Sequence, residues 1–170
     1  MDKQALRKEI VRKLRTFPGR AEESSAIVRS IQMMPEWREA ETILAFSPMR
    51  DEPDITPLLA DSRVLLPYIE GDMLFSASRC FHRAKLGFSE PEHTEAEYKT
   101  ALMLVPLVGY NATRHRLGRG GGYYDRYIQK NRDRLVLLGV ALSPSYVPQF
   151  VPEAFDAVLD MIITANGIYQ

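Results

Sequence analysis

The feature that most constrains the fold of this chain is an uninterrupted apolar run at residues 102–108, which leads toward a glycine-rich segment. Such a run is typical of a strand that is buried on both faces of a parallel sheet. A segment that can form a helix follows the glycines, and then a second apolar run at residues 135–140. This alternation is typical of α/β folds, whose binding sites lie at the carboxyl ends of the strands. The pattern predicts a three-layer αβα chain with a mostly parallel central sheet.

Length and composition favour a single domain over residues 1–170. A chain of 170 residues that is 45% hydrophobic can bury roughly 70% of its unfolded surface. The 22 basic and 22 acidic residues balance, whereas nucleic-acid or membrane-surface partners normally require excess positive charge. Cys80 is the single cysteine, which fits a reducing compartment, and no apolar run approaches the roughly 18 residues of a membrane span. We therefore expect a cytoplasmic monomer with neither nucleic acid nor membrane as a partner.

The remaining apolar patterns predict further helices and strands. The opening segment repeats Leu6, Ile10, Leu14 and Phe17 at helical spacing, as an amphipathic helix does. A second helix of structural role is expected over residues 20–34, just before Pro35. Short apolar runs that end near proline or polar residues predict further strands. These strands are expected at residues 42–46, 63–67, 73–77 and 157–163.

The glycine loop (residues 118–122) is the strongest functional signal, because four of its five residues are glycine. It runs into residues 123–128, which can form the first turns of a helix. A glycine-rich loop before a helix presents free backbone N–H groups and the positive end of the helix dipole, which suit a phosphate. Residues 114–126 contain four arginines but only one acid, Asp125, so the segment carries excess positive charge. The arginines are Arg114, Arg116, Arg119 and Arg126. On this pattern alone, a surface turn before an amphipathic helix is the alternative.

Two common phosphate motifs do not fit the glycine loop. A Walker loop continues with Gly-Lys-Ser/Thr, and this chain has Gly121-Gly122-Tyr123. A dinucleotide fingerprint requires glycine three residues beyond Gly120, where Tyr123 stands.

As a whole, residues 118–125 closely resemble the signature G-x-G-[K/G]-G-[YF]-Y-D of the 5-formyltetrahydrofolate cyclo-ligases, or methenyltetrahydrofolate synthetases. The resemblance implies ATP- and magnesium-dependent conversion of 5-formyltetrahydrofolate to 5,10-methenyltetrahydrofolate, with release of ADP and phosphate. Many members carry lysine where this chain has Gly121, so a phosphate contact by that lysine is not carried over. Residues 86–91 also resemble the linker that precedes the family's next strand.

The resemblance also implies which residues contact ATP. Lys3 and Arg7 match the K-x-x-L-R segment of the family's first helix, although a solvated basic face would give the same spacing. Arg119 is the expected catalytic residue, which stabilises charge on the transferring phosphoryl group. The remaining nucleotide contacts are expected from Arg116, Leu117, Gly118, Gly120, Gly121, Gly122, Tyr123 and Tyr124.

The reduced folate is expected at the acidic loop (residues 49–56). Glu52 occupies the place of the family's folate-binding glutamate, with Asp51 as the alternative, although acids before a helix are usually dipole partners. Tyr68 or Phe75 could supply a flat wall for the pterin ring, although aromatic residues at strand ends are usually core. The glycine loop adds further substrate contacts: Arg119, Gly120, Gly121, Gly122 and Tyr123.

Magnesium is expected at Asp125 and Asp156, because this ion needs only one or two carboxylates beside substrate phosphates. Asp160 is the alternative to Asp156. The three histidines lack a metal-binding spacing and are expected as surface or packing residues: His82, His93 and His115.

Two other functions fit part of this pattern. A non-catalytic phosphate-binding module would keep the glycine loop but would need neither the acids nor a folate pocket. Another enzyme of the same fold could act on a sugar phosphate or a coenzyme A ester.

Overall fold

The computed structural model describes residues 2–83, 89–154 and 156–170. Half of the expected linker at residues 86–91, namely residues 86–88, therefore lies outside the described residues, and the other half forms strand β5 (Ser89–Pro91). Phe155, two positions before the expected last strand, lies outside them as well.

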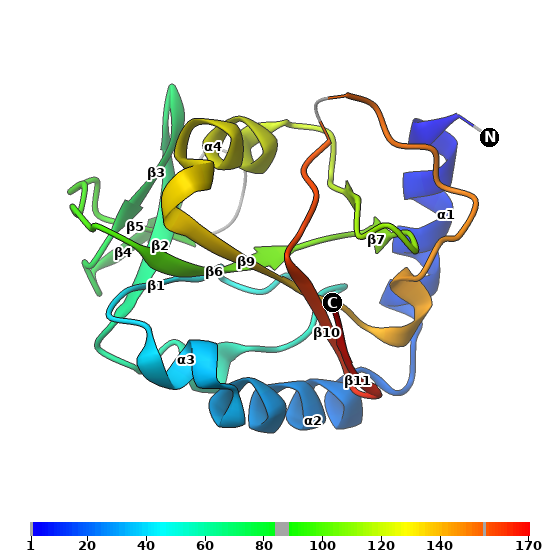
Figure 1. Ribbon diagram of the computed structural model, residues 1–170, viewed down its shortest axis with the longest axis horizontal. Coiled ribbons are helices and arrows are strands. Elements are labelled where there is room, and N and C mark those ends of the chain that lie inside the picture. Colours follow the sequence, from blue (N-terminus) through cyan, green and yellow to red (C-terminus); the bar gives the residue numbers. More distant parts are fainter. Residues whose placement is uncertain (1, 84–88, 155) are drawn as a thin grey trace.

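A seven-stranded sheet forms the middle of the molecule, in the order β11-β10-β9-β6-β1-β2-β3 (Figure 1). The five strands from β10 to β2 run parallel, and the two edge strands join as antiparallel hairpins. Every residue of β6 is buried, which confirms the prediction of a central strand from the apolar run. The strands are β1 Ile43–Leu44, β2 Val64–Glu70, β3 Asp72–Ser76, β6 Ala101–Pro106, β9 Leu135–Val140, β10 Met161–Thr164 and β11 Gly167–Tyr169.

Helices cover both faces of the sheet, so the predicted αβα layering is confirmed. Helices α2 (Arg20–Met33) and α3 (Pro35–Glu39) lie on one face and α4 (Tyr123–Asn131) on the other, while α1 (Lys3–Arg15) stands beside β7 (Figure 1). Buried side chains of α1, α2 and α3 share one apolar cluster with the sheet, and Ile128 of α4 belongs to the opposite cluster. Short 3-10 turns lie at η1 Thr56–Leu58, η2 Arg132–Arg134 and η3 Ser143–Ser145.

Strand β2 continues to Glu70, so the prediction that it ends at Pro67 was wrong. The amide of Ala45 donates to the carbonyl of Leu65, so the backbone polar groups of Leu65 face β1. Those of Pro67, two positions further along β2, face the same side. Of the residues of β2, only Val64 and Leu65 pair with β1. Pro67 lies beyond that pairing, so its missing N–H interrupts no ladder on that side.

The other boundaries differ less. Pro35 ends α2 but also begins α3, because proline suits the first turn of a helix. The last parallel strand begins only at Met161, and the β11 hairpin after it was not predicted.

Two small hairpins flank the main sheet. Strands β4 (Phe81–Arg83) and β5 (Ser89–Pro91) form one, and β7 (Gly109–Tyr110) and β8 (Arg116–Leu117) form the other. The second hairpin lies between β6 and the glycine loop, so the central strand does not lead directly into that loop as expected.

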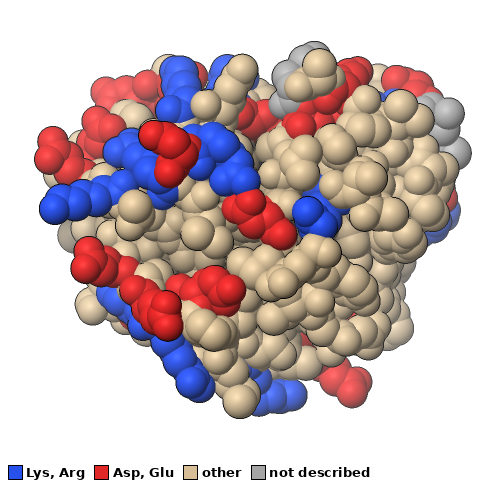
Figure 2. Space-filling model, viewed as in Figure 1, with Lys and Arg blue, Asp and Glu red and all other residues tan. Residues whose placement is uncertain are grey.

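The surface carries charges of both signs. On the face in Figure 2, basic and acidic side chains lie next to one another. Such pairs include those of Lys130 and Arg126 on α4 with Asp72 on β3. Within the described part of the chain, no helix has the length and apolar character that crossing a membrane requires.

Candidate active site

A cavity of about 450 Å³ lies at the carboxyl ends of β1 and β6, where the fold predicts a site. Its wall is largely apolar. One side of the cavity consists of residues 118–125, which comprise the glycine loop and the start of α4, and Glu52 of the acidic loop also lines it. The apolar lining includes Phe46, Met49, Pro67, Ile69, Met73, Leu107 and Val108.

Three glycines of the loop are required by its geometry. Gly120 and Gly122 have φ values of 102° and 69°, which other residues rarely adopt. Gly122 caps α4, and its carbonyl accepts a hydrogen bond from the amide of Arg126 at 3.0 Å. A Cβ atom at Gly118 would lie 2.5 Å from the guanidinium of Arg116. Gly121 differs, because a Cβ atom there would meet only the ring of Tyr123, at 3.0 Å.

Arg116 fixes the start of the glycine loop against the central strand. Its side chain is buried, donates from Nε to the carbonyl of Pro106 at 2.9 Å, and donates from Nη1 to Oδ1 of Asp125 at 2.9 Å. The guanidinium also lies over the ring of Tyr124, 5.1 Å from its centroid. Burial raises the pKa of the Tyr124 hydroxyl, so this ring stays neutral. Leu117 is buried in the core, a position that does not support its expected nucleotide contact.

Arg119 joins the glycine loop to the acidic loop. Its Nη2 donates to Oδ1 of Asp51 and to Oε1 of Glu52, both at 2.9 Å, and its Nε donates to the same oxygen of Glu52 at 3.1 Å. Both acids are about 95% buried, whereas the Arg119 side chain keeps 35% of its surface exposed. Burial alone would lower the pKa of Arg119, but its bonds to the two acids outweigh this effect and raise it. The structure thus brings the expected catalytic and folate-binding residues together.

Helix α2 positions the acidic loop, a role that the sequence did not reveal. Nε of Arg20 donates to the carbonyl of Glu52 at 2.8 Å, and the hydroxyl of Ser24 accepts from the amide of Asp54 at 2.8 Å. The second carboxylate oxygen of Glu52 accepts from the amide of Met49 at 2.8 Å. These bonds hold the buried Glu52 in one orientation, with Oε1 turned to Arg119.

Helix α1 lies against the loop from the other side. Arg7 donates from Nε to the carbonyl of Gly118 at 2.8 Å. Lys3, one turn earlier, contacts Asp156 at 2.6 Å and Glu153 at 2.9 Å. Burial lowers the pKa of Lys3, but its hydrogen bonds to Asp156 and Glu153 outweigh burial and raise the pKa above its usual value. Arg7 therefore contacts the glycine loop directly, and Lys3 pairs with an expected metal ligand, but neither residue belongs to the cavity wall formed by the described residues.

The two expected magnesium ligands lie at adjoining positions. The amide of Ala157, next to Asp156, donates to Oδ1 of Asp125 at 3.4 Å. Magnesium prefers carboxylate oxygens, so both acids offer suitable donors, although Lys3 already pairs with Asp156. Asp160 instead accepts from the amide of Leu137 at 2.8 Å and from Arg132, which supports a structural role for this acid.

Two further observations change the expected lining of the site. Tyr68 and Phe75 are buried at 2% exposure, and neither belongs to the cavity wall formed by the described residues. The expectation that either supplies a flat pterin wall is therefore not supported; Phe46 lines the cavity instead.

Arg126, expected only to add positive charge, donates to the carbonyl of Gly121 at 3.1 Å and lies over the ring of Tyr123.

A model of the 5-formyltetrahydrofolate cyclo-ligase family matches residues 1–165. This chain belongs to that family. Membership makes it an enzyme of the ligase class, in folate one-carbon metabolism.

Individual relatives agree with the family match. The chain is 27% identical to the 5-formyltetrahydrofolate cyclo-ligase of Mycoplasma pneumoniae, with 96% of this chain and 98% of the relative covered. It is 26% identical to the cyclo-ligase of Escherichia coli K12, with 77% and 81% covered. The solved structure of 5,10-methenyltetrahydrofolate synthetase from Aquifex aeolicus superposes with a TM-score of 0.83 at 26% identity, covering 99% of this chain and 92% of that one.

Proposed function

We propose that this chain converts 5-formyltetrahydrofolate to 5,10-methenyltetrahydrofolate, uses ATP and magnesium, and releases ADP and phosphate. The family and the fold of the methenyltetrahydrofolate synthetases support the overall conversion. The observation that carries the proposal for this chain is the contact between Arg119 and Glu52, which both line one cavity, with the buried Asp51 as a second partner of Arg119. This contact puts a candidate phosphate site directly beside a candidate folate site.

The proposed reaction requires two substrates in contact. The formyl oxygen of the folate attacks the γ-phosphorus of ATP, and ADP leaves. N10 then adds to the activated formyl carbon and loses its proton, and phosphate leaves with the former formyl oxygen. Most of the acceleration in such a transfer comes from positioning and charge stabilisation.

In this proposal the glycine loop binds the phosphates through the backbone N–H groups of Gly120, Gly121 and Gly122. Arg119 stabilises the charge that develops on the transferring phosphoryl group, because its guanidinium projects from the same loop. Lys3 and Arg7 add positive charge from α1. Magnesium, held by Asp125 and Asp156, would neutralise further phosphate charge when bound.

The folate would occupy the apolar part of the cavity, with Glu52 as its polar anchor. A buried carboxylate is a strong acceptor for the N–H groups of a pterin ring. In the structure Arg119 already occupies Oε1 of Glu52. Folate binding at this oxygen therefore requires Arg119 to move or to share it, and a shift toward the phosphates would couple the two substrates.

Absorbance in the near ultraviolet tests the proposal, because the methenyl product absorbs there. The protein is mixed with 5-formyltetrahydrofolate, ATP and magnesium, and then with each component left out in turn. We expect product only in the complete mixture. Turnover without ATP would disprove the ligase mechanism. Full turnover in excess chelator would show that the reaction does not require magnesium.

A further inference from the structure

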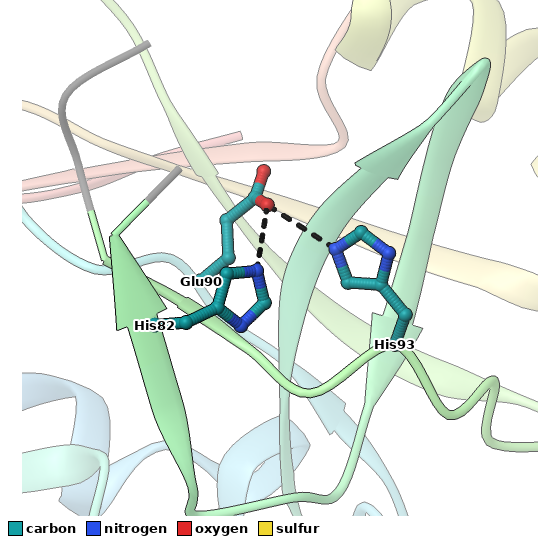
Figure 3. Close-up of side chains that lie close together, drawn as sticks. All are labelled: His82, Glu90 and His93. Carbon is teal, nitrogen blue, oxygen red and sulfur yellow. Dashed lines mark hydrogen bonds and ion pairs between the residues drawn. The ribbon is translucent and has the colours of Figure 1, made fainter. Parts of the chain in front are cut away.

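The hairpin of β4 and β5 carries a cluster of three side chains, none of which lines the active-site cavity. His82 on β4, Glu90 on β5 and His93 just beyond β5 turn toward one another (Figure 3). Nε2 of His93 lies 3.3 Å and Nε2 of His82 lies 3.7 Å from the same oxygen, Oε2 of Glu90. One donor atom from each residue lies within 4.8 Å of the other two. The histidines were expected as surface or packing residues because their spacing in the sequence matches no metal motif.

Glu90 is held in a fixed position for such a role. Glu90 is only 5% exposed, and its other carboxylate oxygen, Oε1, accepts a hydrogen bond from the amide of Ile69 on β2 at 3.2 Å. A carboxylate this deeply buried is costly unless a positive charge or hydrogen-bond donors compensate it. The two imidazoles converge on the oxygen that β2 leaves available.

The His93 ring is fixed as well. It stacks on the buried ring of Tyr68, with centroids 4.5 Å apart and planes 24° from parallel. The His82 ring lies 5.2 Å from the His93 ring, centroid to centroid. In known metal sites, the ligand side chains are oriented by their contacts with other protein groups. Here the stacking of His93 on Tyr68 and the hydrogen bond from the amide of Ile69 to Glu90 would have that function.

We propose that His82, Glu90 and His93 bind a zinc-type transition-metal ion that fastens the hairpin to β2. Two imidazole nitrogens and one carboxylate form a common zinc ligand set, with a fourth position for water. Tetrahedral ligands about 2.0–2.1 Å from zinc lie roughly 3.3 Å from one another. The 3.3 Å separation of Glu90 and His93 matches this value, and His82, whose side chain is 48% exposed, has room to approach Glu90 from its present 3.7 Å.

The ligand chemistry separates this site from the magnesium site at Asp125. Magnesium prefers oxygen ligands, whereas imidazole suits zinc and its neighbours in the transition series. Two alternatives to the proposed site predict different results. A protonated histidine could pair with Glu90 without metal, or a thiolate at the exposed Cys80 could bind zinc instead.

The test uses protein without an affinity tag, freed of metal with a chelator that is then removed. Zinc is titrated in by calorimetry, and cobalt(II) is added separately for its visible spectrum. We expect one zinc per chain, a tetrahedral cobalt spectrum, and a rise in melting temperature with zinc. Excess magnesium should not displace this zinc, because imidazole ligands suit zinc and magnesium prefers oxygen ligands.

Variants distinguish zinc at this cluster from both alternatives. His82→Asn and His93→Phe should each weaken zinc binding at least about tenfold; the phenylalanine keeps the stacking on Tyr68. His115→Ala, at the third histidine, and Cys80→Ser should bind zinc as the unchanged protein does. All variants are compared by circular dichroism in chelator to establish that they fold.

Several outcomes would overturn the proposal. The proposal is wrong if the folded, unchanged protein binds no zinc, or if both histidine variants bind zinc as tightly as the unchanged protein. It is also wrong if Cys80→Ser or His115→Ala loses zinc binding. Because the readout is metal binding, these outcomes do not depend on the proposed ligase reaction.

Discussion

Arg119 and Glu52 are 67 positions apart in the sequence, yet two guanidinium nitrogens of Arg119 donate to one oxygen of Glu52, at 2.9 and 3.1 Å. Asp51 accepts from the same guanidinium. The side chain proposed to act on phosphate is therefore held by the side chain proposed to bind folate. A change at either residue should affect the other, so variants at both positions need controls for this coupling.

Arg119→Ala should lower turnover at least about 10²-fold, the usual effect of removing one charge-stabilising donor. The loss should appear in kcat rather than in the Michaelis constant for ATP, because the interaction is proposed to be strongest in the transition state. Steady-state kinetics with ATP varied at saturating folate measure both constants.

Arg119→Ala also leaves Asp51 and Glu52 buried without their shared cation, so a folding defect must be distinguished from a catalytic one. Arg119→Lys is the matched control, since it keeps a positive charge near both acids. Wild-type turnover in a folded Arg119→Ala protein would refute the catalytic role.

Glu52→Gln should weaken folate binding about 10- to 100-fold, the range for loss of a charge-assisted hydrogen bond. ATP affinity should stay nearly unchanged, because Asp51 still accepts a hydrogen bond from Arg119 and holds its guanidinium. Calorimetric titration with each ligand measures the two affinities. Asp51→Asn serves as the comparison, and if it affects folate binding more than Glu52→Gln does, Asp51 is the folate ligand.

Asp125→Asn should raise the magnesium concentration that half-saturates activity. It should also lower the free energy of unfolding by about 1–3 kcal/mol, because the buried guanidinium of Arg116 loses a charged partner. Denaturant unfolding without magnesium measures stability separately from metal binding. An unchanged magnesium requirement would limit Asp125 to its contact with Arg116.

The glycine loop should tolerate substitution at one position and not at its neighbour. Gly121→Lys should fold and lower the Michaelis constant for ATP, because only the ring of Tyr123 must yield and a positive charge is added. Gly120→Ala should cost about 1–3 kcal/mol, because its φ of 102° strains any side chain. Thermal melts and ATP kinetics test the pair; equal losses of stability would contradict this difference between the two glycines.

The pairing of Lys3 predicts a dependence of stability on alkaline pH. The pKa of Lys3 is raised in the folded protein above its usual value of 10.5 by its bonds to Asp156 and Glu153, against the effect of burial. Its contribution to stability is therefore complete below that usual value and is lost as pH rises through the folded-state pKa. The difference in melting temperature between the unchanged protein and Lys3→Met should stay constant from neutral pH to about pH 9 and shrink above about pH 10.5. A difference that grows with pH would contradict the pairing.

Local patterns in the sequence determined much of the architecture. The apolar run at residues 102–108 predicted the central strand, because a strand covered on both faces must be apolar throughout. The glycines of the loop indicated an unusual backbone, and two of them do have positive φ values. The strand boundary at Pro67 could not be predicted, because the ladder that proline would interrupt ends earlier, at β1.

The contacts of the site were decided only by the tertiary structure. The sheet order brings segments together that are far apart in the sequence, so Lys3 meets Asp156 across 153 positions and Arg119 meets Glu52. The cluster of His82, Glu90 and His93 likewise depends on the pairing of β4 with β5, and no fixed sequence spacing encodes it. Residue types and short periods set which elements form, because those depend on neighbours in the chain. Which side chains meet depends on the packing of distant elements, which only the folded chain determines.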